Sequence, residues 1–347
     1  MSSHPVPGAG ATAAPRGTAR KLTVVVLGLA ALVTVMLCAF ALPNVNGAPH
    51  DVPVGVTGPA QVTRAAEQKL DDEAWDVTVY DSPEALKNAV RDREAMGGLA
   101  LGADGVDVYT ATAAGPSTAS ALTAMGNGLA TQQHTQATAH DVVSFPADDP
   151  RGAGFSSAAL PMIFGGIFPA VILSRLFPGH QGLRTRIAGV LLFSLVAGAA
   201  VAAFLQFGTG SLDGNYGLTS LGLALGMAAL STTFIGLEAV LGFAGLGAGA
   251  GVMMLLGNPL SGLATGPHML PAGWAALGQA LPPGASGSLL RANAFFDGTG
   301  ALVPALTLAA WIVFGLALAL VADRRAKNPR RAAAQADASD ATAAAVV

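Results

Sequence analysis

The side chains best placed to do chemistry gather between residues 258 and 300, in an apolar stretch that Pro and Gly interrupt repeatedly. The candidate functional residues of this loop are Asn258, Pro259, Gly262, Pro271, Trp274, Pro282, Pro283, Arg291 and Asp297. The loop is too apolar for a solvated connection and too broken for a membrane-spanning helix. It predicts short helices that lie at the outer membrane surface or dip into it, with Trp274 at the depth of the lipid headgroups.

Arg291 and Asp297 carry the charge of this loop. A charged group is costly in apolar surroundings unless it finds a partner. Two interpretations are open: the two side chains pair with each other, or Arg291 binds a lipid phosphate. We favour the pair.

The other reactive side chains form no catalytic or metal-binding pattern. His134 and His140 do not have the i, i+4 spacing that places two ligands on one helix face. The single cysteine, Cys38, cannot form an internal disulfide, and the chain has no Gly-x-x-x-x-Gly-Lys-Ser/Thr phosphate loop. We therefore predict a protein that is not an enzyme, with no catalytic residues, no metal and no cofactor.

Long apolar segments must position the loop. Segments long enough to cross a hydrocarbon core of about 30 Å occur at 22–42, 159–177, 187–206, 217–236, 239–257 and 301–322. The chain is 52% hydrophobic and only 11% charged, whereas a soluble domain carries about 25% charged residues. We predict a polytopic α-helical membrane protein of about six transmembrane helices, with an extracytoplasmic α/β domain inserted between helices 1 and 2.

The predicted regions follow from these boundaries. They are a disordered cytoplasmic N-terminus (1–21), transmembrane helix 1 (22–42), the extracytoplasmic α/β domain (43–157), a five-helix transmembrane domain (158–322) that contains the external loop 258–300, and a disordered cytoplasmic tail (323–347). Ala39-Phe40-Ala41 is similar to a signal-peptidase site, so the first span is either a cleaved signal peptide or a retained anchor. Its length of about 20 residues favours the anchor.

Charge sets the predicted orientation. Basic residues beside membrane spans remain in the cytoplasm, and here they flank the first span, the 178–186 loop and the last span. This predicts a multi-pass protein of the cell membrane with both termini in the cytoplasm and 43–157 outside. That segment holds 15 acidic and 6 basic residues, so it lacks the basic face that nucleic-acid binding requires.

The polar segment shows strand and helix patterns in alternation. Strands are predicted at 52–56, at 142–145, and at 75–80, where apolar and polar residues alternate as in a half-buried strand. Strands at 96–101 and 106–109 flank the hairpin turn signal Gly102-Ala103-Asp104-Gly105. Helices are predicted at 59–72, after the N-cap signal Ser82-Pro83-Glu84, and over the Ala, Thr and Gln-rich stretch 117–140.

Glycines four residues apart mark close helix contacts within the membrane spans. The candidate helix-packing glycines are Gly222 with Gly226 and Gly245 with Gly249. Two interpretations are open: a dimer or gating seam, or ordinary packing inside one bundle, which we favour. Ionisable residues are almost absent within the spans, which weakens an interpretation as a proton- or ion-coupled transporter.

The loop motifs carry a family resemblance. Asn-Pro-Leu-Ser-Gly at 258–262, Leu-Pro-x-Gly-Trp at 270–274, Leu-Pro-Pro-Gly at 281–284 and Phe-Phe-Asp-Gly at 295–298 precede the last span in this order. The chain resembles the ABC-2 type transporter permeases, and among them the actinobacterial branch related to the phage-infection-protein (Pip) membrane proteins. The resemblance covers roughly 22–322.

The resemblance implies a bacterial permease domain that moves a lipophilic or cell-envelope substrate outward. It implies a homodimer, or a heterodimer with another permease, that takes its energy from a separate ATP-binding subunit. The large external domain departs from the simplest permeases. A second interpretation is therefore a non-transport envelope protein whose external domain is a receptor or scaffold for a cell-wall component or a phage.

Overall fold

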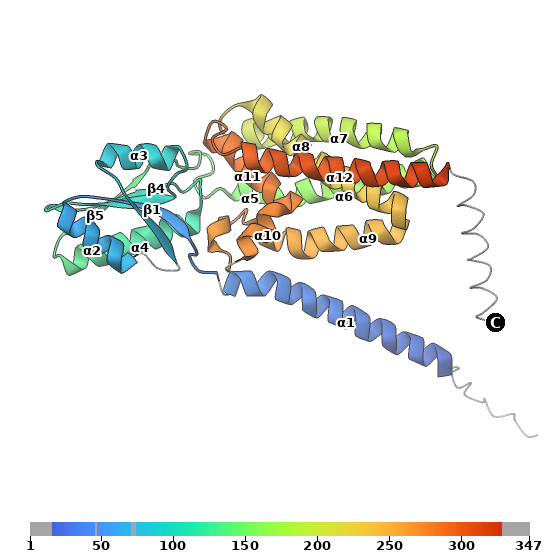
Figure 1. Cartoon of the computed structure of the whole chain (residues 1–347), viewed down its shortest axis with the longest axis horizontal. Helices are drawn as coiled ribbons and strands as arrows, with labels where there is room; N and C mark the ends of the chain where they lie inside the picture. Colours follow the sequence, from blue (N-terminus) through green and yellow to red (C-terminus); the bar gives the residue numbers. More distant parts are fainter. Residues whose placement is uncertain (1–15, 46, 71–73, 272, 328–347) are drawn as a thin grey trace, which may run out of the picture.

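The computed structural model describes residues 16–45, 47–70, 74–271 and 273–327. It is mostly helical, with a small α/β sheet region at one end of a helical bundle (Figure 1). The predicted disorder of 1–15 and 328–347 lies outside the described residues. The sequence assigns residues 16–21 and 323–326 to the disordered termini. They are instead the ends of helices α1 (Arg16–Val45) and α12 (Leu302–Ala326).

The sheet region contains five strands among the described residues, in the order β2-β1-β3-β4-β5. Strand β1 runs parallel to β2 and β3, β4 is antiparallel to β3, and β5 runs parallel to β4. The strands are β1 (Val52–Thr57), β2 (Trp75–Val79), β3 (Gly97–Leu101), β4 (Gly105–Thr110) and β5 (Gln136–Asp141). Buried Val and Leu side chains along these strands form the core of the region.

Three helices cover the sheet. Helices α2 (Ala60–Leu70) and α4 (Pro116–Gln132) lie on one face, and α3 (Pro83–Arg91) lies on the other (Figure 1). The predicted N-cap is present, because the Ala85 amide donates to Ser82 Oγ at 3.1 Å. Since α3 has nine residues, it covers only part of its face.

The end of the sheet region differs from the prediction. The helix predicted at 117–140 ends at Gln132, and β5 follows at 136–141 rather than at 142–145. The backbone turns at His134, which has a φ of +53°, a conformation that stops a right-handed helix. Residues 136–141 then pair with all six residues of β4.

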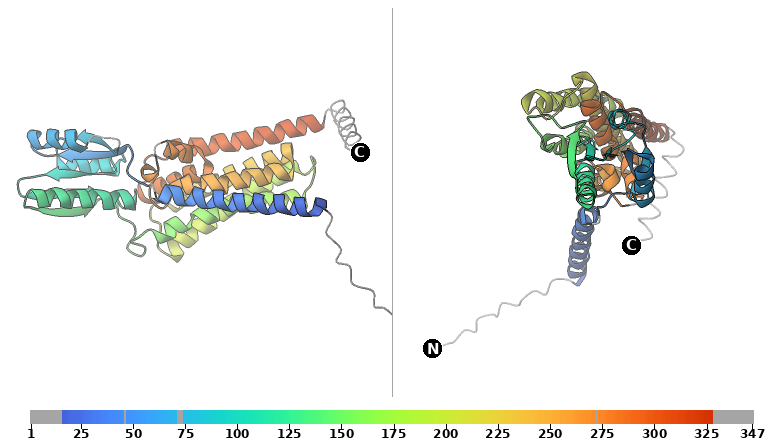
Figure 2. Two further views of the ribbon diagram at one scale, coloured as in Figure 1. Left: turned by 90° about the horizontal axis from the view of Figure 1, so that it is seen from below. Right: turned by 90° about the vertical axis from the view of Figure 1, so that its left-hand side faces the viewer.

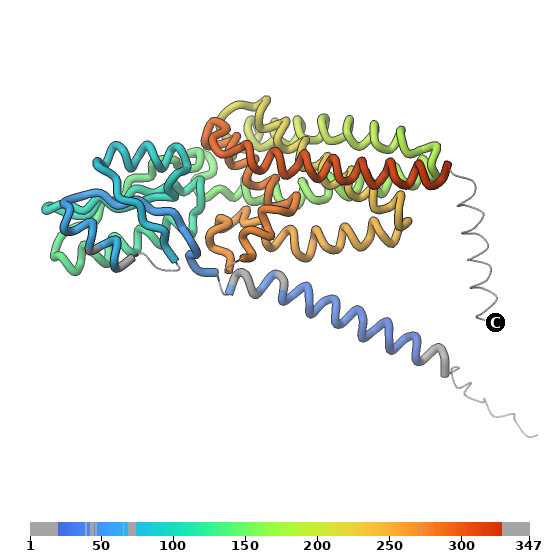
Figure 3. Tube along the Cα trace, viewed as in Figure 1, coloured from blue at the N-terminus to red at the C-terminus, as the bar shows by residue number. Residues whose placement is uncertain are grey.

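The bundle is built around α8 (Tyr216–Leu241), which packs against α6, α7, α9, α11 and α12. Figure 3 traces this part of the chain. Its other helices are α1 (Arg16–Val45), α5 (Ala153–Ser157), α6 (Ala159–Leu176), α7 (Leu183–Ala203), α9 (Phe243–Val252), α10 (Trp274–Ala280), α11 (Pro282–Phe295) and α12 (Leu302–Ala326). Single π-helical turns extend α7 to Gly208 and α9 to Gly257.

Five helices among the described residues are long and apolar enough to cross a membrane, in α1, α5–α6, α7, α8 and α12. They correspond to five of the predicted spans. The remaining predicted span, 239–257, is divided at Gly242, where a φ of +69° ends α8. The apolar helix that follows, Phe243–Gly257, is shorter. Helix α1 contacts the rest of the bundle near Met253–Ser261 and diverges from it toward Arg16 (Figure 1 and Figure 2).

Candidate functional site

Arg291 joins three parts of the chain where the sheet region meets the bundle. It lies in the last turns of α11, and only 2% of its surface is exposed. Its Nε donates to the Ala113 carbonyl at 3.0 Å, and its Nη2 donates to the Leu263 carbonyl at 2.7 Å. Its guanidinium carbon lies 4.9 Å from the ring centre of Phe155. One side chain therefore connects the sheet region, the broken loop and helix α5.

The predicted pair between Arg291 and Asp297 is wrong. Asp297 is exposed at a turn with a φ of +50°, whereas Arg291 turns into the protein and uses carbonyl oxygens. Its burial also removes it from lipid headgroups. Burial lowers the pKa of Arg291 to about 9, and the nearby charge of Arg93 acts in the same direction. The side chain therefore stays charged at neutral pH, stabilised by charge-assisted hydrogen bonds and an aromatic face.

Further contacts hold the same junction. Arg93, just after α3, donates from Nη1 to the Thr299 carbonyl at 3.3 Å, and its guanidinium carbon is 5.1 Å from the ring centre of Phe296. Burial lowers the pKa of Arg93. The His50 amide donates to the His268 carbonyl at 3.0 Å. The sheet region is thus attached to the loop and to the α11–α12 connection at separate points.

An apolar core continues through the junction. Phe155 and Phe295 lie 5.4 Å apart between ring centres, and Phe145 contacts both at 6.3 and 5.3 Å. The buried residues of the sheet region and of the adjoining helix ends form one hydrophobic cluster. Because contiguous burial resists separation of the parts, the sheet region and this end of the bundle are packed as one body.

The first candidate loop residues make a tight turn after α9. The Asn258 carbonyl accepts from Ser261 Oγ at 2.8 Å, and Pro259 begins a 3₁₀ turn. Gly262 has a φ of +62°, and a Cβ there would lie 2.7 Å from the Pro267 nitrogen. Only glycine suits this close approach.

The later loop residues form two short helices, α10 and α11, which we call the re-entrant pair. The Trp274 amide donates to the Pro271 carbonyl at 3.0 Å, and Trp274 begins α10 with 46% of its surface exposed. Pro282 and Pro283 form the buried first turn of α11, a position that suits proline. Trp311 Nε1 donates to the Ala280 carbonyl at 2.8 Å and anchors the tip of the pair part-way along α12. The broken helices predicted for the loop are therefore present.

Gly222 and Gly226 form the surface of α8 on which α11 lies. A Cβ at Gly222 would come within 2.9 Å of Asn293 Nδ2, and one at Gly226 would overlap Ser286. Asn293 Nδ2 also donates to the Leu218 carbonyl at 2.8 Å. These glycines therefore let the re-entrant pair approach α8.

Gly245 and Gly249 pack α9 against α8. A Cβ at Gly245 would lie 2.5 Å from the Leu237 carbonyl oxygen, and one at Gly249 would lie 2.6 Å from Leu237 Cδ1. All four candidate glycines thus contact side chains or backbone of the same chain.

No protein-family model matches this chain, and searches of curated proteins and of solved structures return no match. The family resemblance consequently depends on the loop motifs alone. Sequence reasoning identified Arg291 but missed Ala113, Leu263 and Phe155 around it. Two of these contacts use backbone carbonyls, which leave no side-chain signal; the available signal was a lone arginine in an apolar segment.

Proposed function

We propose that this chain is the membrane-spanning permease subunit of an ABC-2 type exporter, which moves a lipophilic or cell-envelope substrate with energy from a separate ATP-binding subunit. The observation that carries the proposal is the re-entrant pair, which lies among the candidate spans and is tied to the sheet region through Arg291. Broken helices at membrane depth are tolerated only where protein or a cavity surrounds them, as in transport proteins.

A closed seam beneath the re-entrant pair gives the proposal a pathway. Neutral polar groups of Asn258, Ser261 and Ser286 face Ile163 and Leu230 there, and the space between them has no room for a water molecule. Ser286 Oγ is buried without a hydrogen-bond partner among the described residues. Movement of the pair away from α6 and α8 would open a route lined by neutral groups.

An apolar recess supports a lipophilic substrate. It has a volume of about 420 Å³ and lies between the tip of the re-entrant pair and α12, lined by Ala280, Thr307, Ala310, Trp311 and Phe314. Because it opens at the side of the bundle, a lipid-like molecule would enter it from the membrane rather than from water.

The proposed orientation places the sheet region outside the cell and both termini in the cytoplasm of a multi-pass cell-membrane protein. In Figures 1 and 2 the start of α1 and the end of α12 lie at the end of the bundle opposite the sheet region. The 178–186 loop would then contact the ATP-binding subunit. The functional assembly would be a homodimer, or a heterodimer with another permease.

Thiol labelling tests this orientation. In a Cys38→Ser background, we expect Ala103→Cys in the exposed β3–β4 turn to react with an impermeant reagent in intact cells, and Gln181→Cys to react only after lysis. Reaction of Gln181→Cys in intact cells would overturn the proposed topology.

Purification from the native membrane tests the transport role. We expect an ATPase with a phosphate loop to co-purify with the tagged chain, and membrane vesicles to move a lipid-like substrate only with ATP. A stable complex that lacks an ATPase, together with vesicles that show no ATP-dependent movement, would contradict the proposal.

A second candidate function is a non-transport envelope protein whose sheet region is a receptor or scaffold for a cell-wall component or a phage. A polar hollow of about 550 Å³ in the sheet region favours it. Retention of the tagged chain on isolated cell walls, without any ATPase partner, would support this role over transport.

A further inference from the structure

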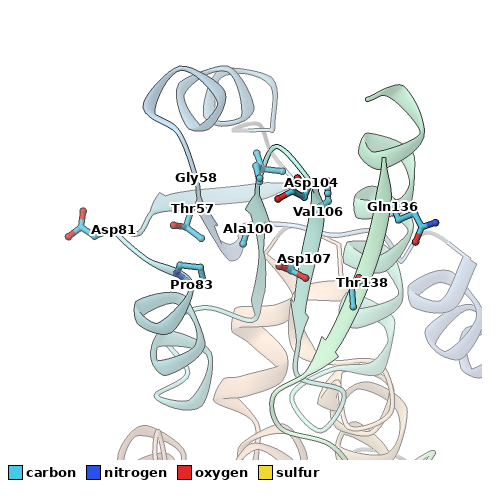
Figure 4. Close-up of a pocket in the computed structure, with 13 residues that line it drawn as sticks. Thr57, Gly58, Asp81, Pro83, Ala100, Asp104, Val106, Asp107, Gln136 and Thr138 are labelled. Carbon is cyan, nitrogen blue, oxygen red and sulfur yellow. The ribbon is translucent and has the colours of Figure 1, made fainter. Parts of the chain in front are cut away.

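The hollow lies on the α3 face of the sheet, at the end of the region where β1 and β3 finish. Figure 4 shows the residues that line it. Thr57, Ala100, Asp107 and Thr138 form one row across four strands: Thr57 is opposite Ala100, Ala100 is opposite Asp107, and Asp107 is opposite Thr138. Residues in one such row lie on the same face of a sheet, so hydroxyl and carboxylate groups share the floor of the hollow.

The neighbouring row explains why the hollow is open. This row consists of Gly55 and Gly98, two residues before Thr57 and Ala100, and of Tyr109 and His140, two residues after Asp107 and Thr138. Leu86 of α3 packs on the two glycines, and a Cβ at Gly98 would lie 2.8 Å from Leu86 Cδ1. The first residue of α3, Pro83, lies at the edge of the hollow. The helix therefore covers the glycine row and leaves the Thr57 row open.

Thr57 provides an observation that points to a ligand. Only 3% of its surface is exposed, it lines the hollow, and its hydroxyl makes no hydrogen bond with any residue that the structure describes. The hydroxyl oxygen opens into the hollow and lacks a partner in the described part of the protein. A ligand in the hollow would supply that partner.

Asp107 is held in position on the same floor. His140 Nε2 lies 2.9 Å from Asp107 Oδ1, and the His140 ring stacks on Tyr109 with 5.3 Å between ring centres. Both side chains are half exposed. The stacked imidazole therefore fixes a carboxylate that a ligand can reach from solvent.

The charges of the hollow select the ligand. Asp81, Asp104 and Asp107 line it, and no lysine or arginine is among its lining residues. A metal ion is a poor match, because no group of three His, Cys, Asp or Glu side chains with metal-binding geometry occurs in the described part of the chain. Hydroxyls at Thr57 and Thr138 add hydrogen-bonding groups beside the carboxylates.

We propose that this hollow binds a small polar ligand in which a protonated amine is flanked by hydroxyl groups, as in an amino sugar. The ammonium group donates to Asp107, with Asp104 adding negative potential, and the ligand hydroxyls bond Thr57 and Thr138. The site does not depend on whether the chain is a transport subunit.

Saturation-transfer difference NMR with the full chain in detergent tests the site. Three probes are titrated: glucosamine, N-acetylglucosamine and cadaverine. The second keeps the ring without the charge, and the third keeps the charge without hydroxyls. We expect glucosamine to bind at least about tenfold more tightly than either, since charged hydrogen bonds are the stronger kind. Equal binding of N-acetylglucosamine or of cadaverine, or no binding of glucosamine, would overturn the proposal.

Variants assign the binding to the hollow. Asp107→Asn should weaken glucosamine binding about tenfold, whereas Asp76→Asn, at an exposed aspartate of β2, should leave it unchanged. Thr57→Val removes the free hydroxyl at nearly constant volume. It should weaken binding severalfold without lowering the melting temperature of the free protein. Unaltered binding by both Asp107→Asn and Thr57→Val would show that glucosamine binds elsewhere.

Discussion

The two ends of the bundle each bury an arginine, and they satisfy it differently. At the end away from the sheet region, Arg186 is 3% exposed and forms an ion pair with Glu238. It also donates to Ser174 Oγ at 3.3 Å and to the Gly179 carbonyl at 3.2 Å. At the sheet end, Arg291 donates to two carbonyls and faces an aromatic ring.

The difference shows what each arginine holds together. The Arg186 pair connects α6, α7 and α8, which are consecutive helices, and it neutralises its own charge. Arg291 keeps its charge and connects segments that are far apart in the sequence, since Ala113 and Arg291 are separated by 178 positions. The first is a clamp between neighbouring helices; the second is the junction between the sheet region and the re-entrant pair.

Removal of the carboxylate at the clamp should have the largest effect. Glu238→Gln leaves Arg186 buried without a counter-charge, which costs about 3 kcal/mol or more of unfolding free energy. Chemical denaturation in detergent measures this. The exposed pair between Glu84 and Lys87 is the control, and Glu84→Gln should cost less than about 1 kcal/mol. Equal effects would mean that Glu238 does not compensate Arg186.

The contact between α8 and α11 is the next point to break. Gly226→Ala forces a methyl group against Ser286, and overpacking of this kind costs about 1–3 kcal/mol. Ser286→Gly in the same chain should restore most of the loss. Gly251→Ala is the matched control, because nothing lies within 4 Å of a Cβ there. Failure of Ser286→Gly to rescue the variant would contradict the packing of the re-entrant pair on α8.

The smallest expected effect is a pH dependence at the junction. Burial lowers the pKa of His268, and its hydrogen bonds with the backbone of His50 and Asp51 partly oppose the shift. The unfolded chain then binds the proton more readily, so stability is lost as pH falls below about 6.5. His268→Gln should flatten this part of the stability–pH curve by about 1 kcal/mol or less. An unchanged slope would assign the dependence to other groups.

Local patterns in the sequence predict much of the fold. Short strand patterns and a hairpin turn signal locate β1 to β4, and apolar length locates five candidate spans. Pro and Gly in 258–300 predict the broken helices of the re-entrant pair. Strand β5 was missed because its composition continues that of α4, and the interruption is a single backbone conformation at His134.

The sites depend on long-range geometry that local patterns do not contain. The partners of Arg291 are carbonyls brought near it by the tertiary fold. The row from Thr57 to Thr138 exists only through the order and register of the strands. Residue types alone therefore identify Arg291 as unusual but cannot indicate what it binds.

Hydrogen exchange on the Arg291→Met variant tests most directly whether this side chain joins the sheet region to the re-entrant pair. The measurement compares wild type and variant in peptides that cover 111–115, 261–267 and the clamp around 238. We predict that amide exchange accelerates together in the first two peptides, because both segments lose the side chain that holds their carbonyls in place and open more readily. Exchange at the clamp should be unchanged. If either junction peptide of the Arg291→Met variant exchanges at the wild-type rate, the account is contradicted.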